Sequence, residues 1–317
     1  EQVNKGSTFF ANNEAGIRLA EEIVGASPCA EKVRFLSSGS EATFYAMRLA
    51  RAKSQRSKIM KFEGGFHGMS DYALMSMAPR RPGNFPQAAS DTAGIPDAIS
   101  NEMLIAPFNN TETAISLIRE HQDELAAVIV EPLQRMIPPE PGFLVALREV
   151  TLECGIALIF DEVVTGFRFA YGGAQEFYGV TPDLCALGKI IGGGYPLSAV
   201  AGKNQFMKYF DAAEVGIDYA VKQIGTLSGN PIASVAGLAT LNVLKGPRIY
   251  DRLFQTGQQF MDGLTDLFAK HRIAAQVRGV PPMFDILFTN ADVIDYRSAT
   301  KSDSAKLKVF NEHVLKG

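Results

Sequence analysis

Short apolar runs that alternate with stretches of helical periodicity constrain the fold of this 317-residue chain more than any other feature. Several runs are continuously apolar, as expected for strands that helices cover on both faces. Strand–helix alternation of this kind predicts an α/β fold with a mainly parallel sheet sandwiched by helices. The predicted strands are Val33–Leu36, Lys58–Phe62, Met103–Ala106, Ala126–Val130, Ile156–Phe160, Leu184–Leu187 and Ser198–Ala201.

Helical patterns lie between these runs. After Ser40, apolar residues recur at spacings of three and four, which gathers them on one helix face. Asn230-Pro231 opens a later helix, because Asn is a favoured N-cap and Pro is favoured at the first helical position. Further helices are predicted at 112–124, 143–153 and 251–270.

Two segments depart from this alternation. Residues 70–101 contain Pro, Met and Gly with little periodicity, and a long irregular stretch in a compact domain is usually a lid or mobile loop. From Lys245-Gly246-Pro247 onward the pattern changes to one helix and scattered short runs. We therefore expect a large domain over 1–245 and the start of a smaller α+β domain over 246–317.

Composition excludes several classes of function. A net charge of −3 without a dense Lys/Arg run argues against nucleic acid as a partner. No apolar run approaches the roughly 18 residues of a membrane span. The histidines lack metal-ligand spacing, so no metal site is expected. Three well-separated cysteines without a C-x-x-C pair indicate free thiols in a reducing, cytoplasmic compartment.

Lys189 lies just past an apolar strand and ahead of Gly192-Gly193-Gly194. Glycines let the backbone approach a bound group, and a partly buried lysine becomes a usable amine nucleophile. The position therefore favours a lysine that forms a Schiff base. An ordinary surface lysine at a strand-to-loop junction is the alternative.

A second motif, Ser37-Ser38-Gly39-Ser40-Glu41, lies between a strand and a helix. Ser38 and Glu41 fit a capping box, which leaves the N–H groups of Gly39 and Ser40 free at the positive end of the helix dipole. This arrangement suits a phosphate group. A capped helix that binds nothing remains the alternative.

The strand of residues 156–160 continues into Asp161-Glu162-Val163, and open α/β sheets bind ligands at such strand ends. Along an extended chain Asp161 and Val163 share a face, and Glu162 points away. A carboxylate there keeps a pyridine nitrogen protonated while the valine packs on the ring. A helix-capping acid is the alternative.

Two loops supply further candidates. Phe66, between glycines, can lie flat on a planar ring or pack in the core, and His67 beside it is a polar contact or a satisfied loop histidine. Thr226 precedes the helix that Asn230 opens, as a second phosphate contact or an ordinary capped turn. Together these elements suit pyridoxal phosphate, which needs a lysine, an acidic partner for its ring nitrogen and a phosphate site.

The ordered motifs resemble those of the class III aminotransferases, enzymes of the aspartate aminotransferase-like fold type I that depend on pyridoxal phosphate. Three motifs are most similar to those of the glutamate-1-semialdehyde aminomutase branch: Thr165-Gly166-Phe167-Arg168, Tyr171-Gly172-Gly173-Ala174-Gln175 and Gly179-Val180-Thr181-Pro182-Asp183-Leu184. The resemblance implies amino transfer between an amine and a carbonyl substrate. It also implies a homodimer whose sites cross the interface.

The resemblance implies a role for each matching residue. Lys189 would carry the cofactor and move the proton, and Asp161 would pair with the ring nitrogen. Val163 and Phe66 would cover the two ring faces, Gly39 and Ser40 would bind the phosphate, and Thr226 would reach the phosphate of the neighbouring subunit. The residues that would line the site are Ser38, Glu131 and His67.

One segment departs from the aminomutase branch. After Glu131-Pro132, that branch carries small residues with Gly, whereas this chain has Leu133-Gln134-Arg135-Met136-Ile137-Pro138-Pro139. We therefore expect a class III transaminase, with glutamate-1-semialdehyde 2,1-aminomutase as the alternative. A non-catalytic nucleotide-binding α/β protein is a remote alternative, weakened by the lack of G-x-G-x-x-G after a strand, and an inactive fragment is another. Family chains extend further at both ends, so an incomplete chain is expected.

Overall fold

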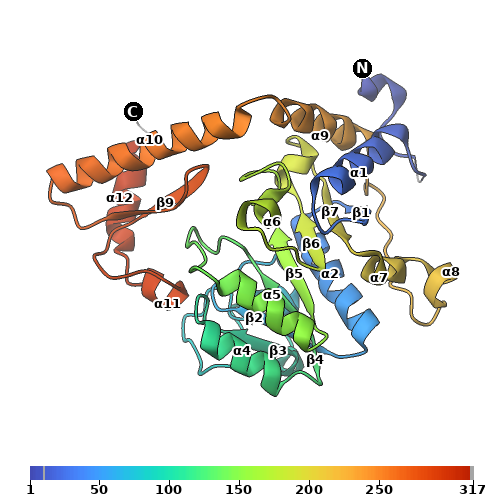
Figure 1. Ribbon diagram of the computed structural model, residues 1–317, viewed down its shortest axis with the longest axis horizontal. Helices are drawn as coiled ribbons and strands as arrows, with labels where there is room; N and C mark the ends of the chain where they lie inside the picture. Colours follow the sequence, from blue (N-terminus) through green and yellow to red (C-terminus); the bar gives the residue numbers. More distant parts are fainter. Residues whose placement is uncertain (10, 315–317) are drawn as a thin grey trace.

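The computed structural model describes residues 1–9 and 11–314, and a seven-stranded sheet lies at its centre (Figure 1). The strand order is β1-β7-β6-β5-β4-β2-β3. β7 runs antiparallel to both neighbours, and the other pairs are parallel, which confirms the predicted mainly parallel sheet. The strands are β1 (Lys32–Leu36), β2 (Lys58–Phe62), β3 (Met103–Ala106), β4 (Leu125–Val130), β5 (Ala157–Glu162), β6 (Leu184–Leu187) and β7 (Ser198–Gly202).

Helices cover both faces of the sheet, each over its own apolar core. α2 (Gly39–Ser54) buries Ala42, Ala46 and Ala50 against one face, where small side chains let the helix approach the strands closely. Four helices pack on the other face, where Leu19, Ile118, Phe143 and Leu241 join one cluster. These helices are α1 (Glu14–Ala26), α4 (Thr111–Glu120), α5 (Phe143–Glu153) and α9 (Pro231–Leu244).

Short elements complete the large lobe. Residues 70–101 hold only one helical turn, one 3-10 helix and an isolated bridge between Met75 and Ser90. The Ser76 amide donates a hydrogen bond to the Ala89 carbonyl at 2.7 Å, so the segment folds back on itself. The short elements are η1 (Gln2–Lys5), α3 (Asp71–Leu74), η2 (Asp97–Glu102), α6 (Gly173–Tyr178), η3 (Lys189–Gly192), α7 (Asn204–Met207), η4 (Lys208–Phe210) and α8 (Ala212–Val215).

A smaller lobe follows α9 and lies to one side of the sheet (Figure 1). Its own apolar cluster centres on Phe268, Ile286 and Phe288. Its elements are α10 (Ile249–Lys270), β8 (Gln276–Val280), β9 (Met283–Leu287), α11 (Tyr296–Ala299) and α12 (Ser304–Val314). Within the described ranges, no helix is long and apolar enough to cross a lipid bilayer.

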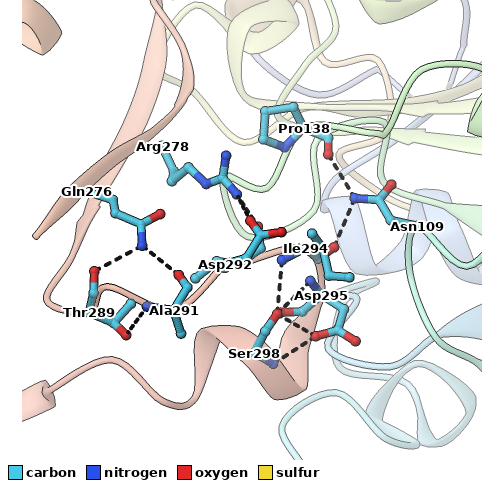
Figure 2. Close-up of polar contacts among 11 residues, drawn as sticks. Asn109, Pro138, Gln276, Arg278, Thr289, Ala291, Asp292, Ile294, Asp295 and Ser298 are labelled. Carbon is cyan, nitrogen blue, oxygen red and sulfur yellow. Dashed lines mark hydrogen bonds and ion pairs between the residues drawn. The ribbon is translucent and has the colours of Figure 1, made fainter.

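Asn109 joins the small lobe to two loops of the large lobe (Figure 2). Its Nδ2 donates hydrogen bonds to the carbonyls of Pro138, at 3.0 Å, and Ile294, at 2.9 Å. Its Oδ1 accepts a hydrogen bond from the Glu140 amide at 2.8 Å. The Asn109 backbone has φ of 63°, a left-handed conformation that Asn tolerates better than most residues. One side chain thus connects three chain segments.

Candidate active site

A pocket of about 290 Å³ opens where β1, β2, β4, β5 and β6 end. Parallel strands bring their carboxyl ends to one edge, so loops distant in sequence meet there. The antiparallel β7 begins at this same edge and adds the residues that precede Ser198. The pocket is lined by Ser37, Ser38, Gly39, Ser40, Thr43, Phe66, His67, Gly68, Glu131, Asp161, Val163, Val164, Lys189, Tyr195, Pro196 and Leu197.

Asp161, at the end of β5, is buried and held at both oxygens. Its Oδ2 lies 2.8 Å from Nδ1 of His67, and its Oδ1 accepts a hydrogen bond from the Val163 amide at 3.1 Å. A carboxylate only accepts hydrogen bonds, so Nδ1 of His67 carries the shared proton. Glu162 points away, as strand alternation predicts, and its carboxylate accepts from Thr165 Oγ1 and from the Ala174 amide at the start of α6.

Gly39 and Gly188 let two backbone segments lie close to Val163. A Cβ on Gly39 would lie 2.9 Å from Val163 Cγ1, and one on Gly188 would lie 3.1 Å from the same atom. Real Cβ atoms essentially never come closer than about 3 Å to such neighbours. The two glycines therefore bring the start of α2 and the residue before Lys189 against one side chain.

The start of α2 carries the predicted anion site. The Ser38 side chain accepts from the Glu41 amide and the Glu41 side chain accepts in return, which confirms the capping box. The amides of Gly39 and Ser40 lie in the first turn, where an anion is stabilised by the helix dipole. Ser40 Oγ accepts a hydrogen bond from the Met69 amide at 3.1 Å, so its own proton is free for another acceptor.

Thr43 and Gly68 hold the 66–69 loop against α2. Thr43 Oγ1 donates to the His67 carbonyl at 2.5 Å. Gly68 has φ of 90°, and a Cβ there would lie 2.5 Å from the Ser40 Cα. Sequence reasoning missed Thr43. It lies one helical turn after Gly39 and Ser40 and therefore on the same face of α2 as they do, and this spacing could have indicated it.

Lys189 lines the pocket, but its surroundings differ from those predicted. Its side chain is exposed rather than partly buried, and its backbone has φ of 47°. The glycines after it do not approach the pocket. A Cβ on Gly193 would lie 2.3 Å from the Ala236 carbonyl oxygen, so this turn is shaped by packing against α9. Gly237 of α9 would likewise place a Cβ 2.0 Å from the Ile191 carbonyl oxygen.

Phe66 and Glu131 share one contact at the pocket. The Phe66 ring is 48% exposed, which excludes core packing and leaves the ring available to a ligand. Its amide donates to Glu131 Oε2 at 2.8 Å. Burial, together with the nearby Asp161 carboxylate, raises the pKa of Glu131 to about 8. Burial and the Asp161 carboxylate therefore favour the protonated form of Glu131 in this pocket.

Lys61 lies fully buried near the pocket. Its Nζ donates to the Ala73 carbonyl at 2.7 Å, and burial lowers its pKa to about 7 despite the nearby Glu131 carboxyl. Sequence reasoning missed it, although a lysine inside the run Ile59-Met60-Lys61-Phe62 was a visible signal.

Thr226 does not join this pocket within one chain. It lines a separate hollow of about 660 Å³ together with Gly225, Ser228 and Asn230. A hollow of about 770 Å³ between α1 and α9 lacks a strand-end carboxylate and a glycine-rich helix start. Of these three hollows, only the one at the carboxyl end of the sheet combines an amine, an anchored carboxylate and a helix start with free amides.

Comparison with known proteins assigns the family. The family described as Aminotransferase class-III matches residues 1–307. The chain belongs to the class III aminotransferases. This family uses pyridoxal phosphate, and the pocket fits that cofactor because it offers a primary amine, an anchored carboxylate and free amides around Val163. With the family shown, the nucleotide-binding alternative is set aside.

Individual relatives are similar over most of this chain. Glutamate-1-semialdehyde 2,1-aminomutase of Methanosphaera stadtmanae is 42% identical over 98% of this chain and 72% of its own length. An omega-transaminase from Sphaerobacter thermophilus is 40% identical with a TM-score of 0.89, covering 94% of this chain and 68% of that one. A glutamate-1-semialdehyde aminomutase from Pseudomonas aeruginosa, 22% identical with a TM-score of 0.81 over 95% of this chain and 67% of that one, shares the fold.

Proposed function

We propose that this chain transfers an amino group between an amine or amino acid and a carbonyl acceptor, with Lys189 and Asp161 as its catalytic residues. One observation carries the proposal. The Lys189 amine lines the same pocket as an Asp161 carboxylate that is held at both oxygens. An amine nucleophile beside a fixed carboxylate is the pair that pyridoxal phosphate chemistry requires.

The other pocket residues bind and orient the cofactor in this proposal. The amides of Gly39 and Ser40, with the free Ser40 hydroxyl, bind the phosphate at the positive end of α2. Val163 packs on one ring face, and the exposed Phe66 stacks on the other. Ser38, Glu131 and His67 line the site, where His67 orients Asp161.

When bound, pyridoxal phosphate supplies an aldehyde that condenses with amines and a ring that delocalises the electron pair left on the substrate carbon. Asp161 would keep a proton on the ring nitrogen, because its carboxylate is held in place by His67 and by the Val163 amide. Lys189 Nζ would take the proton from the substrate carbon that bears the amine, acting as a base, and would later give that proton back, acting as an acid.

Borohydride reduction of the protein loaded with pyridoxal phosphate tests the proposal. We expect peptide mapping to find the modification on Lys189, and the Lys189→Ala variant to lose both the modification and turnover. Lys203 is the matched control, because its Nζ pairs with Asp183 at 2.8 Å outside the pocket. An unmodified Lys189 would refute the proposal.

The aminomutase is the second candidate, because the relatives at about 42% identity carry that name. Such an enzyme moves the amino group within one carbon skeleton, with the same residues in the same roles. A screen of amino donors and acceptors, run beside an assay of glutamate-1-semialdehyde isomerisation, separates the two. Turnover that needs two different substrates supports the transaminase, and turnover of the semialdehyde alone supports the aminomutase.

We further propose a homodimer in which Thr226 serves the neighbouring subunit's phosphate site. Thr226 lies outside the pocket of its own chain. Ile224 near it is 93% exposed, and a second subunit that covers this apolar side chain would explain its exposure. Mixing Lys189→Ala subunits with Thr226→Val subunits tests this arrangement. If each site takes Lys189 from one subunit and Thr226 from the other, one of the two sites in a mixed dimer contains both natural residues. We expect activity to recover on mixing, and no recovery would contradict the shared site.

Two organisational points belong to the same proposal. We propose that the chain divides near Lys245-Gly246-Pro247, because the cluster around Phe268 and Ile286 is separate from the core of the sheet. We also propose a cytoplasmic location, since Cys29, Cys154 and Cys185 are free thiols. Limited proteolysis tests the division, and cell fractionation tests the location.

A further inference from the structure

The turn of residues 134–137 adopts a backbone conformation that its sequence does not favour. The Ile137 amide donates a hydrogen bond to the Gln134 carbonyl at 2.8 Å, which closes the turn. Arg135 and Met136, between them, have φ of 50° and 61°. Glycine and asparagine accept such left-handed angles readily, whereas arginine and methionine seldom adopt them. Strain of this kind persists only where surrounding contacts hold the chain, and it concentrates at functional sites.

Two side chains of this turn bind consecutive carbonyl groups of the loop that leads to Phe66. Gln134 Nε2 donates to the Glu63 carbonyl at 2.7 Å. Arg135 Nε donates to the Gly64 carbonyl at 2.6 Å. These carbonyls lie only two and three residues before Phe66, so the turn restrains the backbone that carries this pocket-lining ring.

Arg135 also reaches two other parts of the molecule. Its Nη2 donates to the Met77 carbonyl at 2.7 Å, and its guanidinium lies 5.1 Å from the centre of the Tyr296 ring in α11. Tyr296 in turn packs on the backbone of Gly64, where an added Cβ would lie 2.7 Å from the Tyr296 Cβ. A planar guanidinium can bind two carbonyls and an aromatic face at once. One side chain therefore connects the loop of Phe66, the irregular segment that contains Met77 and the small lobe.

Both flanks of the turn are anchored. On one side, Glu131 Oε2 accepts a hydrogen bond from the Phe66 amide at 2.8 Å. On the other side, Asn109 Nδ2 donates to the Pro138 carbonyl at 3.0 Å (Figure 2). These anchors keep the strained turn against the loop of Phe66, so the contacts of Arg135 are built into the fold.

We propose that Arg135 is a positioning residue for Phe66. By binding the Gly64 carbonyl, it keeps the Phe66 ring where the ring can stack on pyridoxal phosphate. The inference deepens the proposed function and rests on it, because that function places Phe66 on one face of the cofactor ring. Glycine would fit the backbone at this position better, but it has no side-chain donors for the Gly64 and Met77 carbonyls. The need for those donors explains why a strained arginine stands here, in the segment where the sequence departs from the aminomutase branch.

Arg135→Gly tests the proposal, because it relieves the backbone strain and removes the donors in one change. Relief of strain offsets the lost hydrogen bonds, so we expect the urea midpoint of the apoprotein to change little. Amide hydrogen exchange in the apoprotein should nevertheless become about tenfold faster at Gly65 and Phe66, whose amides are bonded to the Phe62 carbonyl and to Glu131. Titration followed by cofactor absorbance should show that pyridoxal phosphate binds about five- to tenfold more weakly.

Arg272→Gly is the matched control. Arg272 is an exposed arginine with φ of 54°, and its side chain makes no hydrogen bond to any residue that the structure describes. The change therefore relieves the same kind of strain without removing such a contact. We expect it to leave exchange at Gly65 and Phe66 unchanged, together with the affinity for pyridoxal phosphate.

A double-mutant cycle shows whether Arg135 acts through Phe66. Phe66→Leu removes the stacking ring and should itself weaken cofactor binding. In that background Arg135→Gly should weaken binding by less than about twofold more. A full additional loss of about five- to tenfold would mean that Arg135 acts by another route, and it would overturn the proposal.

Three other results would overturn it as well. Unchanged exchange at Gly65 and Phe66 in Arg135→Gly would show that the arginine does not hold the loop. Faster exchange without weaker cofactor binding would show that this restraint does not serve the cofactor. Faster exchange throughout the protein, with a lower urea midpoint, would indicate a purely structural role. Failure of borohydride to modify Lys189 would instead refute the proposed function and leave the exchange result in the apoprotein standing.

Discussion

Replacement of Gly39 by Ala tests whether close packing around Val163 builds the phosphate site. Gly39 is the first residue of α2, and in an open helix position Ala stabilises relative to Gly by up to about 1 kcal/mol. Here the added Cβ would lie 2.9 Å from Cγ1 and 3.1 Å from Cγ2 of Val163. Packing therefore opposes helix propensity at this position.

These two opposing effects set the expected change in the free energy of unfolding. Extra carbon atoms in a packed site cost about 1–3 kcal/mol, because Val163 or the α2 backbone must shift. Both alternatives displace the amides of Gly39 and Ser40 from the rest of the pocket. After the gain from helix propensity is subtracted, we expect Gly39→Ala to lower the free energy of unfolding by up to about 3 kcal/mol and to weaken retention of pyridoxal phosphate.

Urea unfolding of the apoprotein measures the stability change, and absorbance of the bound cofactor measures retention. Gly263→Ala in α10 is the matched control, because nothing lies within 4 Å of its added Cβ, and it should stabilise slightly. Val163→Ala removes both atoms that the Gly39 Cβ would meet. In that background Gly39→Ala should lose most of its cost, a coupling of about 0.5–3 kcal/mol.

Two results would refute this reasoning. If Gly39→Ala were as harmless as Gly263→Ala, the contact with Val163 would not restrict α2. If the cost were unchanged in the Val163→Ala background, it would arise elsewhere than at the valine, and the two glycines would not explain how the pocket is assembled.

Three further variants test other contacts. Gly237→Ala would place a Cβ 2.0 Å from the Ile191 backbone oxygen, so we expect about 3 kcal/mol or more of lost stability in urea and reduced labelling of Lys189; normal values for both would contradict the packing of α9. Glu131 has a pKa raised from 4.5 to about 8, so its contribution to stability is full below pH 4.5 and is lost as the pH rises through about 8. Glu131→Gln should flatten that part of the pH–stability curve, and an unchanged curve would rule this contribution out. Asn109→Gly keeps the left-handed backbone but removes three side-chain hydrogen bonds, one of which, to the Ile294 carbonyl, ties the small lobe; we expect a loss of about 1–3 kcal/mol in urea, and full stability would show that these bonds do not contribute.

The sheet could be predicted because the signal for each strand is local. Continuous apolar runs gave strands that agree with the structure to within a residue or two, as for β2 (Lys58–Phe62) and β6 (Leu184–Leu187). Strand alternation also predicted that Asp161 and Val163 would share a face and that Glu162 would point away. Each of these inferences depends on neighbours along the chain.

The parts that could not be predicted depend on contacts between distant segments. The glycines after Lys189 suggested a backbone close to a bound group, whereas Gly193 packs against a helix that begins more than thirty residues later, at Pro231. The contact between His67 and Asp161 gave no signal in sequence, because the two residues lie 94 positions apart in the chain. Burial and pairing of this kind are set by tertiary packing and carry no local pattern.

The position of β1 at the edge of the sheet has a consequence during synthesis of the chain. β1 pairs with β7 in the register Lys32 with Gly202, so its partner emerges from the ribosome about 170 residues later. At roughly 5–20 residues per second, that strand waits about ten seconds or longer without its partner. An unpaired strand is a template for wrong pairing, so chains interrupted before Gly202 should aggregate. Nascent chains that end after Gly202 can close the sheet and bring the segments of the pocket together.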